Sequence, residues 1–302
     1  MQNMQRRSKN IFVWSILAYP LLLFAVFYIG VNFNSIIMAF RKFDFDGSVS
    51  FAGFSNFAEF FASVAEDGSL LNISLINSLK MYFINLVICM PLYIFFSYLL
   101  FKKFPFHKGI RAIVLIPQVV STFVITLLFQ KFVNGVLPAL FGAFGVEDFP
   151  VLLTDPKYSF GTTLFYMIWI SFSVSLIVYP NAMNEIPGEV MESAAIDGIN
   201  GIFQELYHMI LPLIFPTLST FLITGFAGIL TATGPILEFY MYSAMPEVYN
   251  MGYYFLVKVM KGSETFDYPV LAAGGLVMTL VMAPLTNLLK FFLDKVGPTV
   301  EY

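Results

Sequence analysis

The sequence predicts an all-α integral membrane protein with six transmembrane helices. The chain of 302 residues is 58% hydrophobic and only 12% charged, and its mean hydropathy is +0.79. A soluble domain carries about a quarter charged residues, so the composition excludes a soluble fold. The apolar residues also gather in long segments, and a spanning helix needs about 20 of them. A helix pairs all of its own backbone groups, which lipid requires, so segments of this length are expected to be helical.

Six apolar segments are long enough to span, and together they predict a single transmembrane domain over residues 1–302. The first follows Arg6, Arg7 and Lys9 and exceeds the roughly 7–15-residue core of a cleavable signal, so we interpret it as a span. The fourth is the shortest and carries three serines, yet it remains long enough to cross. The predicted spans are 11–33, 76–100, 110–132, 162–179, 209–230 and 271–293.

The distribution of Lys and Arg over the loops predicts that both termini are cytoplasmic. Nine of these residues then lie inside, in short segments where the positive-inside rule acts most strongly, against seven outside. The external segments 34–75, 133–161 and 231–270 are too long for simple turns, and we expect short surface helices in them. The inside residues are Arg6, Arg7, Lys9, Lys102, Lys103, Lys108, Arg111, Lys290 and Lys295.

The cytoplasmic loop 181–208 departs from this pattern, because it holds acidic residues and no Lys or Arg. A loop that served only to set topology would carry positive charge there. We therefore expect another constraint on its sequence, such as a basic surface on a partner protein. The acidic residues are Glu185, Glu189, Glu192, Asp197 and Glu205.

The residue types in this loop predict a helix, a turn and a second helix. Pro187 suits the first turn of a helix, where its missing N–H would be unpaired in any case. Glu189 and Glu192 then lie near the positive end of the helix dipole. Asp197-Gly198 is a stop signal, because Gly accepts the left-handed conformation that ends many helices. The residues alone fit either an ordinary interfacial loop or a surface that inserts into another protein.

Two motifs in this loop occur in a fixed order: Glu192-Ser193-Ala194-Ala195-Ile196-Asp197-Gly198 and, ten residues later, Met209-Ile210-Leu211-Pro212. Together they resemble the EAA loop of the permease subunits of bacterial ATP-binding-cassette (ABC) importers. The resemblance implies a type I importer permease whose cytoplasmic coupling helix docks on a separate ATPase subunit. The residues that it assigns to coupling are Glu189, Glu192, Ser193, Ala194, Ala195, Asp197 and Gly198.

Two departures from the family pattern bear on this loop. Ser193 replaces an Ala, a small-for-small change that should leave docking intact. Ile199 stands where the family usually has Ala, and the spacer to the Leu-Pro element is one residue longer. Because one inserted residue rotates a following helix by about 100°, we expect a local adjustment, such as a bulge, in the second helix.

Four further elements resemble the carbohydrate branch of this family, the maltose-permease-like subunits. They follow one another in the family's order on the predicted six-span topology. The elements are Phe51-Ala52-Gly53-Phe54-Ser55-Asn56-Phe57, Asn77-Ser78-Leu79, Pro117 with Ser121, and Gly234-Pro235.

The resemblance implies a permease of the bacterial inner membrane that carries a sugar or oligosaccharide and forms half of a translocation pathway. The implied partners are a second, non-identical permease, a dimer of ATPase subunits and an extracytoplasmic sugar-binding protein. ATP and Mg²⁺ are expected on the ATPase, and no cofactor is expected on this chain. The sequence holds no phosphate-binding loop of the Gly-x-x-x-x-Gly-Lys-[Ser/Thr] type and no metal-ligand spacing. We therefore expect neither an enzyme nor a nucleic-acid partner.

Candidate substrate contacts are polar or aromatic residues within or beside the spans. Such residues are costly in lipid and usually face a bundle interior or a cavity, although Ser and Thr also bond across to neighbouring helices. The first three of the chosen residues share one helix face beside Pro117. The chosen residues are Gln118, Ser121, Thr122, Trp169, Ser173, Thr233, Glu238 and Tyr240, from a wider set that includes Asn85, Ser171, Ser175 and Thr224.

The charges favour a neutral sugar as the substrate, because no Lys or Arg lies at the midpoint of a predicted span to meet a phosphate or carboxylate. Three alternatives stay open. One is a permease of the same class for a polyol or a glycerol phosphate ester. Another is an ion-coupled secondary transporter. Such a transporter needs buried acidic or His residues that relay ions, and the only candidate beside the predicted spans is Glu238, near a span boundary. The last is a membrane scaffold that transports nothing.

Overall fold

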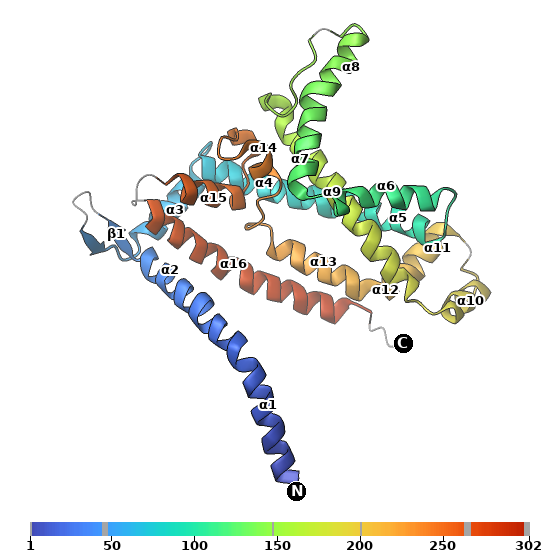
Figure 1. The fold of residues 1–302 in the computed structure, drawn as a ribbon, viewed down its shortest axis with the longest axis horizontal. Helices are drawn as coiled ribbons and strands as arrows, with labels where there is room; N and C mark the ends of the chain where they lie inside the picture. The colour runs from blue at the N-terminus through green and yellow to red at the C-terminus, as the bar shows by residue number, and fades with distance from the viewer. Residues whose placement is uncertain (1, 44–47, 147, 200, 263–266, 299–302) are drawn as a thin grey trace. The chain divides into compact units, whose positions relative to one another are not determined.

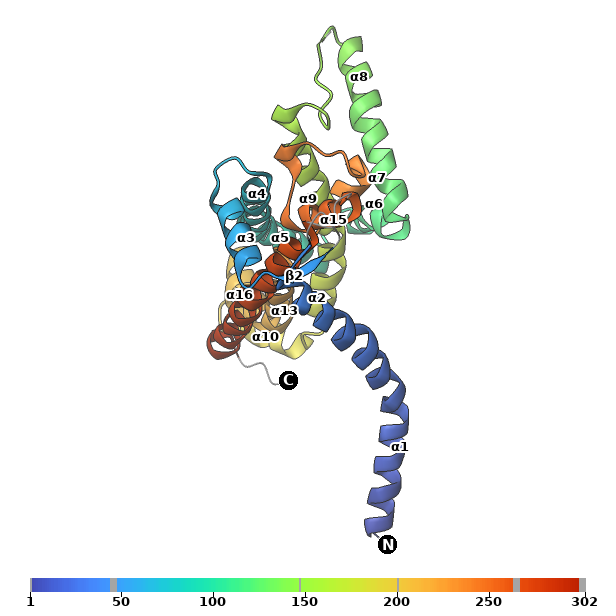
Figure 2. The same cartoon turned by 90° about the vertical axis from the view of Figure 1, so that its left-hand side faces the viewer.

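The computed structural model describes residues 2–43, 48–146, 148–199, 201–262 and 267–298, which Figures 1 and 2 draw from the N-terminus to the C-terminus. The chain groups into two compact units, Met1–Ala65 with Lys258–Leu280 and Glu66–Val257 with Val281–Tyr302. The organisation of residues 1–302 as a single transmembrane domain stays a prediction.

The described elements are helical apart from one hairpin. Four π-helical turns, η1 to η4, lie within longer helices, and η5 is a 3₁₀ turn. In chain order the elements are α1 (Gln2–Leu23), η1 (Phe24–Gly30), α2 (Val31–Ala39), β1 (Arg41–Phe43), β2 (Val49–Phe51), α3 (Ser55–Ala65), α4 (Leu70–Ile84), η2 (Asn85–Cys89), α5 (Met90–Phe101), α6 (His107–Val119), α7 (Thr122–Lys131), η3 (Phe132–Val136), α8 (Leu137–Ala143), α9 (Pro156–Asn184), α10 (Gly188–Ile196), α11 (Ile202–Glu205), η4 (Leu206–Ile210), α12 (Leu211–Leu213), α13 (Phe215–Ala227), α14 (Ile236–Tyr240), η5 (Pro246–Val248), α15 (Met251–Lys261) and α16 (Asp267–Val296).

The predicted all-α membrane fold is confirmed. Within the described residues, five helices are long and apolar enough to cross a membrane, and there are six if a bent pair of helices counts as one span. The bent pair is Ile202–Leu213 with Phe215–Ala227, at an angle of 72°. The five long helices are Phe12–Ala39, Leu70–Phe101, Thr122–Ala143, Pro156–Asn184 and Asp267–Val296.

The predicted segment 110–132 differs most from the observed helices, because it falls on two of them. Val120 and Ser121 adopt extended backbone angles, with ψ of 141° and 134°, and separate α6 from α7. Pro117 lacks the N–H that would bond one turn back, which weakens the end of α6. The 13 residues of α6 reach only about 20 Å. The spanning helix is therefore Thr122–Ala143, which continues beyond residue 132.

The predicted fifth span, 209–230, also contains a break. Ile214 leaves the helical conformation with φ −91° and ψ 6° between α12 and α13. Pro216 follows in the first turn of α13, and its missing N–H leaves the carbonyl of Pro212 without its helical donor. The bend of 72° arises at this point.

In the first unit, the side chain of Asn56 fixes the hairpin and α3 to the end of α2. Its buried Nδ2 donates to the backbone oxygens of Ala39 and Arg41, each at 2.8 Å. The strands pair antiparallel, with Arg41 opposite Phe51. Gly53 precedes α3 with φ +56°, a conformation that Gly adopts without strain. Gly53 and Asn56 of the motif 51–57 thus each have a structural role.

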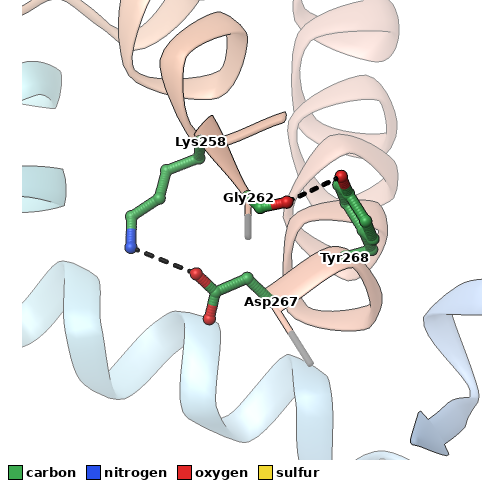
Figure 3. A network of polar contacts seen from close by, with 4 residues as sticks. All are labelled: Lys258, Gly262, Asp267 and Tyr268. Carbon is green, nitrogen blue, oxygen red and sulfur yellow. Dashed lines mark hydrogen bonds and ion pairs between the residues drawn. The ribbon is translucent and has the colours of Figure 1, made fainter. Parts of the chain in front are cut away.

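Polar contacts also link α15 and α16 in the first unit, on either side of residues 263–266 (Figure 3). Lys258 Nζ lies 3.4 Å from Asp267 Oδ2. The hydroxyl of Tyr268 donates to the backbone oxygens of Val259 and Gly262, each at 3.3 Å. These contacts hold the start of α16 against the end of α15.

In the second unit, α5 and α6 both pack along α9, and Figure 1 shows α5 and α6 side by side. The main core cluster joins the ends of α5, α9 and the fifth span. Its most buried members are Tyr98, Met183, Ile210 and Ile214, each at most 2% exposed.

Two residues of the second motif attach segment 247–251 to α4. The Nδ2 of Asn77 donates to the backbone oxygens of Glu247 at 2.8 Å and Tyr249 at 3.0 Å. The Oγ of Ser78 accepts from the backbone N–H of Met251 at 2.9 Å. Both side chains are buried, so this attachment is shielded from water.

Candidate functional site

The predicted helix–turn–helix forms within loop 181–208, apart from Asn200, which lies outside the described residues. Pro187 immediately precedes α10, and Gly198 follows its end with φ +90°. The N–H of Ile199 bonds the oxygen of Ala194 at 3.0 Å, and the N–H of Gly198 bonds that of Ala195 at 3.3 Å. This pair of bonds is the Schellman motif, which requires a left-handed residue at the position of Gly198.

One side of α10 is exposed and the other packs on the core. Met191 and Ala194 contact the main core cluster, which fixes the orientation of the helix. The other six predicted coupling residues are exposed. Ile196 lies beside them and is 87% exposed. It is an apolar side chain on the exposed side of α10 that the sequence analysis did not select. Its position could have been noticed in the sequence, because it is an apolar residue in the last turn of a helix that carries acidic residues.

A hollow of about 480 Å³ lies between α10 and the start of the fifth span. His208 and Pro212 form one of its sides. The other side carries four predicted coupling residues, Glu189, Ser193, Ala194 and Asp197. The loop therefore offers a concave surface as well as an exposed helix.

The second helix of the loop contains the expected local adjustment. The π-helical turn η4 (Leu206–Ile210) joins α11 to α12. A π turn takes up an additional residue within a continuing helix. A π turn before Leu211-Pro212 is the kind of local adjustment that the longer spacer predicts.

The carboxylate of Glu205 bonds to side chains at the end of α5. Its Oε1 lies 2.6 Å from Lys102 Nζ, and its Oε2 accepts from the hydroxyl of Tyr98 at 2.9 Å. The carboxylate is 15% exposed. These bonds place the loop after α5 and the loop 181–208 at the same end of the second unit, which agrees with the predicted topology.

The predicted pathway residues around the α6–α7 break do not gather in a cavity. Gln118, Ser121 and Thr122 are exposed, and Ser121 immediately precedes α7. The carbonyl of Thr122 accepts from the hydroxyl of Thr126 at 2.7 Å, a contact within the helix.

Trp169 and Ser173 are placed by helix packing. Trp169 packs against a second core cluster beside Phe129 and Tyr166, with ring centroids 6.1 and 5.9 Å away. Ser173 is fully buried, and its hydroxyl bonds back to the oxygen of Trp169 at 3.5 Å. Both residues fit the simpler expectation of contacts between helices.

The last three predicted pathway residues lie near α14. Thr233 bonds the oxygen of Gly234 at 3.4 Å, and the hydroxyl of Tyr240 donates to the oxygen of Leu153 at 2.8 Å. Glu238 Oε2 is buried, and no described residue forms a hydrogen bond with it. The eight predicted pathway residues thus occupy three separate places.

A cavity with a volume of about 510 Å³ lies elsewhere in the second unit, between α4–α5, α9 and α13. None of the eight residues lines it. Four members of the wider polar set do, and the described lining residues carry no charge. The Nδ2 of Asn85 donates to the hydroxyl of Tyr93 at 3.4 Å. The polar and tyrosine side chains of the lining are Ser78, Tyr82, Asn85, Tyr93, Ser171, Ser175, Tyr179, Thr224 and Asn250.

No family model matches the chain. Among curated proteins, the multiple sugar-binding transport system permease MsmF of Streptococcus mutans is 25% identical over 228 residues, which are 72% of this chain and 74% of MsmF. The galactooligosaccharide transport system permease GanP of Bacillus subtilis is 28% identical over 129 residues. That match covers 41% of this chain and only 30% of GanP.

Two solved structures share the whole fold. A bacterial ABC transporter that imports the acidic polysaccharide alginate has a chain that superposes with a TM-score of 0.80 at 19% identity. The match covers 98% of this chain and 99% of that chain. The same kind of importer, in complex with a periplasmic protein bound to an alginate pentasaccharide, gives 0.75 at 20% identity, over 94% of each chain. In sequence, this chain is similar to curated permeases of sugar transport systems, and in fold it matches a chain of an ABC importer of a polysaccharide.

Proposed function

We propose that this chain is the permease subunit of an ATP-driven, binding-protein-dependent importer for a sugar or oligosaccharide. It forms half of the translocation pathway, and both of its termini are cytoplasmic. The observation that carries the proposal is α10, an exposed helix held on the core by Met191 and Ala194 and ended by Gly198. Its partners are a second permease subunit, two ATPase subunits and an extracytoplasmic sugar-binding protein. ATP and Mg²⁺ bind the ATPase.

The packing of α10 supports a route from the ATPase to the pathway. Met191 and Ala194 contact the core cluster that contains Tyr98 of α5 and Met183 of α9. Both helices continue into the wall of the 510 Å³ cavity. Closure of the ATPase dimer moves α10, and the tightly packed core passes the movement to α5 and α9. The free energy that shifts the pathway between its two states comes from the different affinities of the ATPase and of the sugar for those states.

The cavity lining supports a neutral sugar. Amides and hydroxyls bond sugar hydroxyls, and tyrosine faces suit the C–H side of a sugar ring. A carboxylate there would lose its hydration without a cationic partner among the described lining residues, which is costly. This chain therefore differs from the alginate importers in the charge of the sugar that it carries.

Co-purification followed by reconstituted uptake tests the proposal. The tagged chain, solubilised from native membranes, should retain an ATPase, a second permease and a solute-binding protein. Uptake into vesicles should need ATP inside and the binding protein outside, and it should favour neutral oligosaccharides over uronate oligosaccharides, polyols and glycerol phosphate esters. Uptake driven by an ion gradient without any ATPase would instead establish a secondary transporter.

A further inference from the structure

A small basic cavity lies at the end of α5, beside loop 181–208. It has a volume of about 130 Å³, and the side chains of Lys103, His107 and Arg111 line it. Leu176, Pro180 and Asn184 of α9 form the opposite wall, together with Leu100 and Phe101. We call this cavity the basic notch. It is separate from the large cavity and from the hollow beside α10.

The cations of the basic notch have no acidic partner among the described residues. Lys102 is paired with Glu205 at 2.6 Å, but no described carboxylate forms an ion pair with Lys103, Lys108 or Arg111. Glu185, the nearest acidic residue in sequence to the α9 wall, forms no such pair either. Uncompensated positive charge around a cavity attracts an anion.

The start of α6 adds to this field. His107 is the first residue of the 13-residue α6, and Phe106 before it is left-handed with φ +66°. The first-turn N–H groups of a helix carry a partial positive charge and favour phosphate groups. Side-chain charge and helix dipole therefore act on the same small volume.

The surroundings of the notch indicate that the anion comes from the membrane. Phe104 and Phe106 lie in the turn between α5 and α6 and are 56% and 87% exposed. Aromatic side chains flanked by Lys and Arg are typical of segments at the headgroup level of a bilayer. The notch holds the volume of about four water molecules, which suits a phosphate group better than a sugar.

We propose that the basic notch binds the phosphate of an anionic phospholipid headgroup in the cytoplasmic leaflet. Lys103 and Arg111 bond the phosphate oxygens, and Phe104 and Phe106 lie among the upper acyl chains. The lipid thereby holds the α5–α6 turn and the end of α9, next to the loop 181–208. The site depends on the membrane fold and not on which solute is carried.

Lipid binding to the detergent-purified complex tests the site by native mass spectrometry. Phosphatidylglycerol should remain bound in preference to phosphatidylcholine. The double substitution K103Q/R111Q should weaken phosphatidylglycerol binding by about twenty-five-fold, since each Lys or Arg near anionic lipid contributes about fivefold. K290Q/K295Q makes the same change in charge at the end of α16 and should have no effect. Circular dichroism and gel filtration establish that both variants are folded.

Three outcomes would overturn the proposal. Equal retention of phosphatidylglycerol by K103Q/R111Q and the unchanged protein would exclude the notch as the site. Equal retention of phosphatidylcholine would show that charge plays no part. Displacement of the lipid by millimolar inorganic phosphate would assign the notch to a soluble phosphate instead.

Discussion

At the scale of single residues, Gly198 shows how one position sets the end of α10. A Cβ at this position would meet no atom within 4 Å, so the demand for Gly comes from φ +90° and not from crowding. The Schellman bonds of Gly198 and Ile199 form only when this angle is kept.

We therefore expect Gly198→Val to abolish ATP-dependent uptake while the chain still inserts and assembles. A β-branched residue strains a left-handed conformation, and relief of the strain unwinds the end of α10. Gly198→Asn is the matched control, because Asn tolerates this region, and it should retain most of the uptake. Uptake by Gly198→Val at the unchanged rate would refute the coupling role.

Glu205 illustrates a residue whose role the sequence did not predict. The acidic loop suggested docking on a basic partner, but this carboxylate binds Tyr98 and Lys102 of its own chain. Position in the sequence could not show it, because residues 98 and 205 are brought together only by packing of the spans.

A double-mutant cycle of Glu205→Ala with Tyr98→Phe should give a coupling energy of about 1.5–3 kcal/mol, the range for hydrogen bonds to charged groups. Thermal unfolding in detergent measures it. Additive effects of the two substitutions would show that the 2.9 Å bond contributes nothing to stability.

At the scale of elements, Asn77 and Ser78 explain why a polar pair begins the second span. They bond three backbone groups of segment 247–251, which is distant in sequence. The sequence motif indicated that these residues matter, but their partners became visible only in the fold.

Asn77→Ala should lower the free energy of unfolding by about 1–3 kcal/mol, because it leaves the buried oxygen of Tyr249 and the partly buried oxygen of Glu247 without this donor. Asn287→Ala on α16, where the exposed amide bonds only its own helix, is the control and should change stability by less than about 0.5 kcal/mol. Urea denaturation followed by tryptophan fluorescence compares the two. Equal shifts would contradict the attachment.

The predictability of the elements follows from the range of the forces involved. Apolar length predicted the spans, and local chemistry predicted the start of α10 after Pro187 and its end at Gly198. The break at Val120–Ser121 and the bend at Ile214 were missed, because hydropathy is continuous across both. A proline lies close to each of these two positions. However, Pro180 and Pro284 lie within helices that are not broken, so proline alone does not locate a break.

At the scale of the whole molecule, the cavity shows where sequence reasoning about the site stops. Polarity in a span selected Asn85, Ser171, Ser175 and Thr224, which line the cavity, but it could not rank them above Gln118 or Trp169. Which polar residues share a cavity depends on the rotation of three packed helices relative to one another, and a single sequence holds no direct record of that rotation.

Asn85→Leu should reduce sugar uptake by about tenfold, the value of one good hydrogen bond in a site shielded from water. Assembly with the ATPase should be unchanged, because no residue of α10 lines the cavity. Asn287→Leu makes the same replacement outside the cavity lining and should leave uptake intact. Equal uptake by the two variants would place the sugar pathway elsewhere.

The bend at Ile214 has a mechanical consequence. One arm of the fifth span, α11–α12, continues from the coupling loop, and the other arm, α13, carries Phe221, Thr224 and Gly225 on the cavity wall. A straight rod pushed at one end only slides along its axis. Because the two arms are bent by 72°, the proposed movement of the loop would rotate α13 and carry its cavity-lining residues across the proposed path of the solute.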